Sequence, residues 1–235
     1  MTTHPLSVRT SGVQYWQRFE APGPDQAAWT DRYPAPMPDG CRLVLPLRDL
    51  GEVAVAGFIA NQASFPVLDQ VAAWTAAAAE RFQAEVVVGL PTLGHTIGAA
   101  VARALGHPGW VAPSTTRKRW YDDALSAPLG SITAPATGVN ATRRMWLDPR
   151  LLDRLHGRRV LLVDDVISTG SSALAGLALL RAAGIAPVGL AVAMVQGEAW
   201  RTAWPASVEV EAAFRTPRFH RAPGGSKAGE WKAGE

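Results

Sequence analysis

The sequence predicts a single α/β domain with a central, mostly parallel sheet flanked by helices and a small terminal annex. From residue 85 onwards, short apolar runs rich in β-branched residues alternate with alanine-rich stretches. Continuously apolar strands are typical of parallel sheets that helices cover on both faces. A chain of 235 residues is long enough to bury a large core. The single cysteine, Cys41, excludes an internal disulfide network and a cysteine-rich zinc site.

The N-terminal part of the chain is the least regular. Residues 1–40 are rich in Pro and Gly with scattered aromatic side chains, which is compatible with short strands or with a loose cap. Arg42–Leu47 and Glu52–Ile59 have the composition of strands. We therefore divide the chain into a variable segment over 1–60 and a core over 61–214.

Helices and strands alternate through the predicted core. Ser64–Phe82 combines an alanine run with spaced apolar side chains and is predicted to be a helix. The elements predicted after it are the strands Glu85–Leu90, His107–Ala112, Arg159–Val163, Pro187–Val195 and Val208–Phe214, and the helices Ile97–Leu105 and Ser172–Ala183.

Two polar segments do not follow this alternation. Residues 113–145 carry both signs of charge and no helical stripe, so we expect a long, flexible loop or a hairpin. Loops of this length in compact domains often cover active sites. Residues 215–235 form a basic, glycine-containing tail, which is either disordered or part of the terminal annex.

No part of the sequence indicates export or insertion into a membrane. Met1–Gly12 lacks the apolar region of a signal peptide. Ala173–Val195 is apolar, but Arg181, Gly184 and Pro187 interrupt it, which indicates a buried helix followed by a buried strand. We expect a cytoplasmic protein.

The chemistry is concentrated in Val160–Ser172, with the sequence VLLVDDVISTGSS. A buried strand ends in Asp164 and Asp165, and a loop of small hydroxyl residues then leads into a helix. Ligands of open α/β sheets bind beyond the carboxyl ends of the strands, and a helix N-terminus suits a phosphate. Gly170 allows the backbone to approach an anion closely. Because the two carboxylates would repel a phosphate, they must serve another group, such as sugar hydroxyls or Mg²⁺.

This segment resembles the phosphoribosyl-diphosphate (PRPP) motif of type I phosphoribosyltransferases at all thirteen positions. A Walker-type NTPase would also place an Asp after an apolar strand, but the chain has no GxxxxGK[ST] sequence. The resemblance implies the fold of that family, with a hood at a terminus. It implies that Asp164 and Asp165 hold the ribose hydroxyls directly or through Mg²⁺. The residues implied to bind the 5′-phosphate are Ser168, Thr169, Gly170, Ser171 and Ser172.

Val88–Ala102 resembles the pyrophosphate loop of the same family and is most similar to its adenine-specific branch. In that branch the loop carries an acid and an arginine, where this chain has Pro91 and Leu93. Backbone N–H groups from Thr92 to His95 are then left to bind pyrophosphate, and the His95 imidazole is interpreted as structural or exposed. The PRPP-binding residues implied here are Leu90, Pro91, Thr92, Leu93 and Gly94.

A basic cluster, Arg117, Lys118 and Arg119, stands where type I enzymes carry a flexible loop. The resemblance implies that the loop closes over the site, with Arg117 and Lys118 acting on the departing pyrophosphate and Arg119 contacting PRPP. The alternative is a solvated basic loop. Arg143 and Arg144, near the far end of this segment, are either a second phosphate contact or exposed charges.

The base is less well defined than the phosphate sites. Ser168 stands where 6-oxopurine-specific relatives carry an acid that contacts purine N7, so an adenine-like or orotate-like base is favoured. The resemblance implies that a hood from either terminus recognises the base. Candidate side chains in the two termini are Trp16, Phe19, Phe219 and Trp231.

These features predict an Mg²⁺-dependent phosphoribosyltransferase that transfers the 5-phosphoribosyl group of PRPP to a nucleobase, in purine salvage with an adenine-like base. The alternative is a non-catalytic regulator of the same fold that binds PRPP or a nucleotide, with nucleic acid as a further partner; Pro91 and Leu93 suggest it. The net charge of +3 combines basic clusters with paired acids, which suits a small polyphosphate better than nucleic acid. The resemblance also implies a homodimer.

Overall fold

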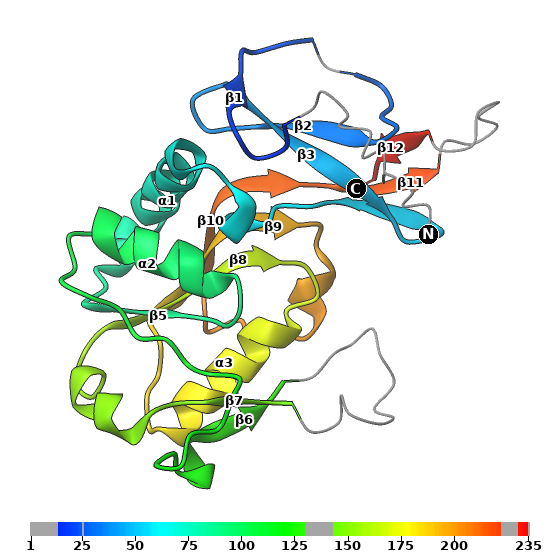
Figure 1. Ribbon diagram of the computed structural model, residues 1–235. Helices are drawn as coiled ribbons and strands as arrows, with labels where there is room; N and C mark the ends of the chain where they lie inside the picture. Colours follow the sequence, from blue (N-terminus) through cyan, green and yellow to red (C-terminus); the bar gives the residue numbers. More distant parts are fainter. Residues whose placement is uncertain (1–13, 25, 130–142, 222–229, 235) are drawn as a thin grey trace, which may run out of the picture.

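The computed structural model describes residues 14–24, 26–129, 143–221 and 230–234. The predicted N-terminal segment, polar loop and basic tail are therefore each described only in part. The described residues form a parallel sheet, an antiparallel sheet, a short hairpin and three α-helices (Figure 1).

A four-stranded sheet in the order β10-β9-β8-β5 forms the centre of the core, and all of its pairs are parallel. All residues of β9 and all of β8 except Val166 are buried, which explains why both strands are apolar without alternation apart from Asp164, Asp165 and Gln196. The sheet confirms the predicted fold class. Its strands are β5 (Val86–Gly89), β8 (Val160–Ile167), β9 (Gly189–Gln196) and β10 (Val210–Thr216).

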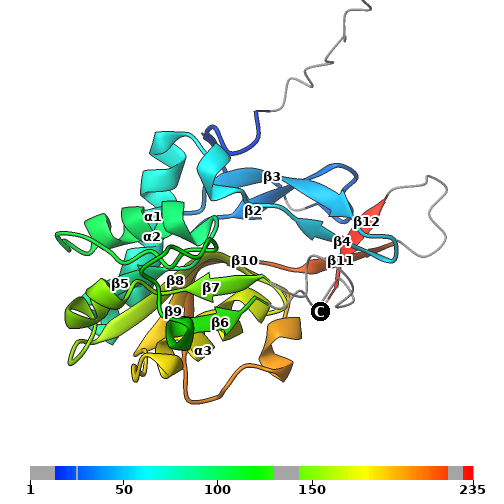
Figure 2. The ribbon, with the colours of Figure 1, turned by 60° about the horizontal axis from the view of Figure 1, so that its bottom comes forward.

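Helices cover both faces of this sheet. On one face, α1 (Phe65–Ala79) packs over β9 and β10, and α2 (Gly94–Ala104) packs over β5 and β8 (Figure 1). On the other face, α3 (Ser171–Ala182) shares a second apolar cluster with residues of β8 and β9 (Figure 2). The three predicted helices are therefore confirmed, with shifts of a few residues at their ends.

Both ends of the chain build the second, antiparallel sheet. β11 pairs with β4 and β12 pairs with β11, so strands of the N-terminal segment and of the tail lie side by side (Figure 1). The aromatic rings of Trp29, Tyr33 and Phe219 contact one another edge to face, with centroids 5.0–5.5 Å apart. The strands are β1 (Phe19–Glu20), β2 (Arg32–Pro36), β3 (Arg42–Asp49), β4 (Val53–Ala56), β11 (Arg218–Arg221) and β12 (Trp231–Ala233).

The described parts of the tail thus belong to a sheet, and residues 222–229 lie outside the described residues. The four aromatic residues suggested for base recognition all pack against the apolar core, and Phe219 and Trp231 are almost completely buried. These contacts help to join the N-terminal segment and the tail to the core, and a role of the four residues in base recognition stays a prediction.

Two predicted elements differ in the structure. His107–Ala112 is not a regular strand: only Val111 pairs, in a parallel bridge with Val88, and Pro108 and Gly109 precede it. The described ends of the 113–145 segment form a hairpin of β6 (Ser126–Pro128) and β7 (Arg144–Trp146), which packs on α3. Residues 130–142, which belong to the predicted loop over 113–145, lie outside the described residues.

Short 3-10 helices cover several connections. They span Ala60–Gln62, Glu80–Phe82, Asp123–Leu125, Pro149–Arg154 and Ala199–Thr202. Within the described ranges, no helix combines the length and the apolar character needed to cross a membrane. The apolar stretch Ala173–Val195 is divided between α3 and β9, as its interrupting residues predicted.

Candidate active site

A cleft of about 440 Å³ lies where β5 and β8 end and where α2 and α3 begin. This is the edge at which open α/β sheets bind their ligands. The residues that line it are Pro91, Thr92, Leu93, Leu129, Arg143, Asp164, Asp165, Val166, Ser171 and Ser172. Residues 91–93, residues 129 and 143 of the hairpin, and residues from 164 to 172 are thus brought to one site.

Asp164 and Asp165 form a buried carboxylate pair near the end of β8, with exposed fractions of only 6% and 9%. The backbone N–H of Asp165 donates to Oδ1 of Asp164 at 3.0 Å. Burial, followed by the charge of Asp165, raises the pKa of Asp164 well above its usual value, and burial also raises the pKa of Asp165. A cation or hydroxyl donors from a ligand would relieve this excess of negative charge.

The pair suits one particular mode of Mg²⁺ binding. Within the described residues, no group of three or more His, Cys, Asp or Glu side chains is placed to hold a metal. Mg²⁺ is commonly held by one or two carboxylates together with substrate phosphates and water, rather than by a cage of protein ligands. The residues present therefore fit an ion that arrives with a polyphosphate.

The α3 turn, which we define as Ser168–Ser172, forms a small hollow at the N-terminus of α3. Residues 166–173 line a space of about 210 Å³, and Gly170 takes a left-handed conformation with φ of 80°. No side chain caps the helix, so its first N–H groups are directed at this space. The Thr169 and Ser171 hydroxyls lie 3.2 Å apart. N–H groups, hydroxyls and the positive end of the helix dipole are the groups that favour an anion, and phosphate binding here stays a prediction.

The α2 turn, which we define as Leu90–Gly94, faces the same cleft. Pro91, Thr92 and Leu93 line it, and the peptide bond between Pro91 and Thr92 is cis. A Cβ atom on Gly94 would lie 2.6 Å from Oδ1 of Asp164, so only glycine allows α2 to begin this close to the acids. Leu90 is fully buried and packs against Gly176 of α3. Leu90 therefore positions the turn from the core.

Comparison with known proteins agrees with this arrangement. Residues 59–207 match the model of the phosphoribosyl transferase domain. The chain belongs to the phosphoribosyl transferase domain family. This match confirms the family resemblance, and it includes both helix turns and the acidic pair.

Several phosphoribosyltransferases resemble the chain over part of its length. An adenine phosphoribosyltransferase from Corynebacterium kroppenstedtii is 32% identical over 124 residues, which cover 50% of this chain and 58% of the relative. An orotate phosphoribosyltransferase from Thioalkalivibrio sulfidiphilus is 34% identical over 99 residues, which cover 37% of this chain and 46% of the relative. The matches thus span about half the length of these curated relatives.

A solved structure supports the fold. The adenine phosphoribosyltransferase from Thermoanaerobacter pseudethanolicus has a TM-score of 0.51 at 18% identity, over 64% of this chain and 80% of that chain. The parallel sheet with its flanking helices is therefore the core of a phosphoribosyl transferase domain.

His95, which follows the α2 turn, has a structural position in this domain. Its Nε2 lies 2.8 Å from the carbonyl oxygen of Pro113, and its ring contacts Trp110 edge to face. Burial lowers its pKa, so the ring is neutral at pH 7 and Nε2–H donates to that carbonyl. The side chain joins α2 to the segment that follows Val111.

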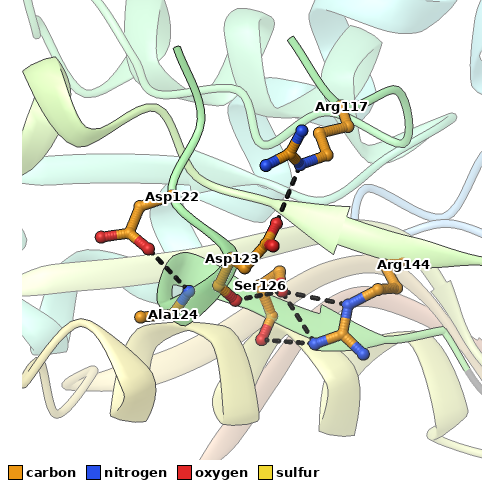
Figure 3. Close-up of polar contacts among 6 residues, drawn as sticks. All are labelled: Arg117, Asp122, Asp123, Ala124, Ser126 and Arg144. Atoms are coloured by element: carbon orange, nitrogen blue, oxygen red, sulfur yellow. Dashed lines mark hydrogen bonds and ion pairs between the residues drawn. The ribbon is translucent and has the colours of Figure 1, made fainter. Parts of the chain in front are cut away.

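The basic residues of the phosphoribosyl transferase domain do not all reach the cleft. Arg117 pairs with Asp123 at 2.8 Å, as Figure 3 shows, and its guanidinium lies over the Trp146 ring. Lys118 and Arg119 are exposed, and in the described part of the chain none of the three lines the cleft. The role implied for them on the leaving group stays a prediction.

Three cleft residues were not assigned a firm role from the sequence. Leu129 and Arg143 come from the hairpin, where the N–H of Leu129 donates to the carbonyl of Arg143 at 2.9 Å, and Val166 follows the acidic pair. The double-arginine sequence marked Arg143 as a possible phosphate contact, but only the pairing of β6 with β7 distinguishes it from Arg144. Val166 was part of the recognised motif without a role of its own.

Proposed function

We propose that this protein is a PRPP-dependent phosphoribosyltransferase that transfers the 5-phosphoribosyl group to a nucleobase and releases pyrophosphate. One observation carries the proposal: two helix N-termini open into a single cleft, and a buried carboxylate pair stands between them. Two anion sites flanking an acidic, cation-seeking centre match a ligand with phosphate at both ends of a sugar. Membership of the phosphoribosyl transferase domain family supports the same reading.

Each part of the cleft has a task in this reaction. The α3 turn would bind the 5′-phosphate through N–H and hydroxyl donors, and Asp164 and Asp165 would accept hydrogen bonds from the ribose hydroxyls. The backbone of the α2 turn would face the pyrophosphate. When bound by the two carboxylates, Mg²⁺ would offset negative charge on the diphosphate.

The chain contributes alignment and charge stabilisation to the chemical step. A base nitrogen attacks C1 of the ribose while the bond from C1 to the pyrophosphate oxygen breaks, so negative charge grows on the leaving group, and the proton of that nitrogen is released to solvent. The N-terminus of α2 presents the positive end of its dipole to that charge. Holding the sugar at both ends fixes C1 for in-line attack.

The proposed acceptor is adenine or a similar base, in purine salvage. Ser168 at the α3 turn provides no carboxylate for purine N7, which disfavours 6-oxopurines. Because one curated relative is an adenine enzyme and another an orotate enzyme, orotate is included in the test. A homodimer and a cytoplasmic location stay predictions.

The test is release of pyrophosphate from PRPP and Mg²⁺ in the presence of adenine, hypoxanthine, guanine or orotate. We expect release with adenine, and loss of release and of PRPP binding in Asp164→Asn/Asp165→Asn. Asp69→Asn, an exposed acid on α1, is the matched control and should behave as the unmodified protein. A double variant that binds PRPP normally but unfolds more easily would overturn the assignment of the acids.

The second candidate is a regulator that binds PRPP or a nucleotide without turnover. It is favoured by the α2 turn, in which Pro91, Thr92 and Leu93 offer no charged side chain to a leaving group. Calorimetric binding of PRPP without pyrophosphate release with any of the bases would support the regulator and contradict the enzyme. Salt-dependent binding of RNA or DNA would point the same way.

A further inference from the structure

Arg143 is placed differently from the arginine that follows it. It precedes β7, and the hydrogen bond between Leu129 and the Arg143 carbonyl extends the hairpin pairing to this position. Successive side chains of an extended strand point to opposite faces. Met145, two residues on, is fully buried in the cluster shared with α3, so Arg143 lies on the same face of the hairpin, where it is exposed and lines the cleft.

Arg144 lies on the opposite face and is held there. Its Nε and Nη2 donate to Oγ of Ser126 at 3.0 and 2.8 Å, as Figure 3 shows. Its guanidinium also lies 5.8 Å from the centroid of the Trp146 ring, over which Arg117 lies as well. Arg144 and Arg117 therefore stabilise the hairpin and its flanking segment.

The cleft thus contains one basic side chain among its described lining residues, and that side chain is Arg143. It shares the cleft with Pro91, Thr92 and Leu93 of the α2 turn and with Ser171 and Ser172 of the α3 turn, but it does not line the hollow formed by residues 166–173. The charge of Arg143 is therefore available to the part of the ligand that faces the α2 turn.

We propose that Arg143 binds the pyrophosphate group of PRPP and supplies the positive charge that the side chains of the α2 turn lack. The inference rests on the proposed function, because it needs PRPP as the ligand. A guanidinium can donate two parallel hydrogen bonds to a phosphate, which an ammonium cannot, and hydrogen bonds to charged groups are the stronger ones. Arg143 would thus be a binding residue contributed by the hairpin rather than by either helix turn.

The test is calorimetric titration of Arg143→Ala, Arg143→Lys and the unmodified protein with Mg²⁺-PRPP, Mg²⁺-pyrophosphate and ribose 5-phosphate. For Arg143→Ala we expect affinity for PRPP and pyrophosphate to fall about 10- to 100-fold, the range of a charged hydrogen bond. Affinity for ribose 5-phosphate should stay within about two-fold, since the α3 turn binds it. Arg143→Lys should recover part of the loss.

Two further variants make the result specific. Arg103→Ala removes an exposed charge on the last turn of α2, at the far end from the cleft, and should leave all three affinities unchanged. Lys118→Ala tests the basic cluster of 117–119. Loss of pyrophosphate affinity in Lys118→Ala but not in Arg143→Ala would overturn the inference.

The inference and the proposed function fail in different ways. If the unmodified protein binds PRPP and Arg143→Ala binds it equally well, the inference alone is wrong. The same holds if Arg143→Ala loses ribose 5-phosphate affinity as strongly as pyrophosphate affinity. If the unmodified protein binds neither PRPP nor pyrophosphate, both the inference and the proposed function are wrong.

Discussion

The two helix turns that face the cleft differ in how they are built. The α3 turn carries four hydroxyl residues and a glycine with positive φ, and it encloses a hollow of its own. The α2 turn has Thr92 as its one hydroxyl residue, and Gly94 presses its backbone against Asp164. Neither helix has a side-chain cap, but at α2 the N–H groups of His95 and Thr96 already donate to the carbonyls of Thr92 and Leu93 at 3.4 and 3.1 Å.

Under the proposed function, this difference means that the two turns bind phosphate groups in two different ways. The α3 turn is self-contained, because backbone and side-chain donors come from five consecutive residues, Ser168–Ser172. The α2 turn lies close to Asp164 but has few polar side chains, so an anionic ligand there needs a positive charge from another part of the protein. For this reason we expect the positive charge of Arg143, on the hairpin, to strengthen binding at the α2 turn and not at the α3 turn.

Gly94→Ala should give the largest effect, because it breaks the close approach on which the α2 turn depends. The new Cβ would lie 2.6 Å from Oδ1 of Asp164 and 3.0 Å from the carbonyl oxygen of Val163, and a backbone atom cannot easily give way. We expect the free energy of unfolding to fall by about 2–3 kcal/mol. PRPP affinity should fall more than about 100-fold, measured by denaturant titration and calorimetry.

Gly23→Ala is the matched control, since no atom lies within 4 Å of the Cβ that it would add. It should leave stability and affinity as they are. A Gly94→Ala protein with unchanged stability and binding would show that α2 can shift, and the turn would then not be set by this contact.

Ser171→Ala/Ser172→Ala tests the self-contained turn and should have the next largest effect. The loss of two hydroxyl donors should lower the affinity for ribose 5-phosphate and for PRPP about 10- to 100-fold. The free energy of unfolding should change by less than about 0.5 kcal/mol. Thr92→Val, the corresponding variant of the α2 turn, should lower the affinity for pyrophosphate by no more than about three-fold. Equal losses of affinity in the α3-turn and α2-turn variants would contradict the view that only the α3 turn binds its ligand through side-chain hydroxyls. All three affinities are measured by calorimetry.

The α3 turn and the acids could be predicted from the sequence because they are contiguous. Val160–Ser172 holds a strand, both carboxylates and the anion loop in one stretch, and local pattern is enough to order them. The helices could be placed for the same reason, as each has its own alanine-rich or apolar pattern. The structure extends β8 to Ile167, so Asp164 and Asp165 lie within the strand rather than after it.

Features that depend on distant pairing could not be predicted in this way. β4 pairs with β11, more than 160 residues away, and no local signal in a basic tail indicates that partner. The face on which Arg143 lies follows from the register of β6 against β7, in which Ala127 lies opposite Met145. His107–Ala112 has an apolar composition, but only Val111 has a neighbour with which to pair.

The acids between the two turns make stability depend on pH, and Asp164→Asn should reveal it. The folded pKa of Asp164 is raised above 3.8, so the folded state holds its proton more tightly than the unfolded state does. The free energy of unfolding should therefore fall as pH rises from about 4 through the raised pKa. Asp164→Asn should be the more stable protein at pH 8 and show a flatter profile by denaturant titration.

Asp69→Asn again serves as the control, because it removes an exposed carboxylate. A steeper pH dependence in Asp164→Asn than in the unmodified protein would mean that the pair is compensated by a charge near the α2 turn. The negative charge of Asp164 and Asp165 would then be offset within the protein itself, and not by the ligand as we propose.

His95→Phe should have the smallest effect on function, and it tests whether the α2 turn acts through its backbone alone. The variant keeps an aromatic ring against Trp110 but loses the hydrogen bond to Pro113, so we expect a stability loss of about 1 kcal/mol. The folded pKa of His95 is lowered below 6.5, so its stabilising effect is present above that pH and is lost as pH falls and the ring must gain a proton. His95→Phe should lack that acid-side loss in denaturant titrations at pH 5 and 8. Its pyrophosphate release should stay within about two-fold of the unmodified protein with the same pH profile, whereas a shifted profile would place the imidazole on the reacting groups.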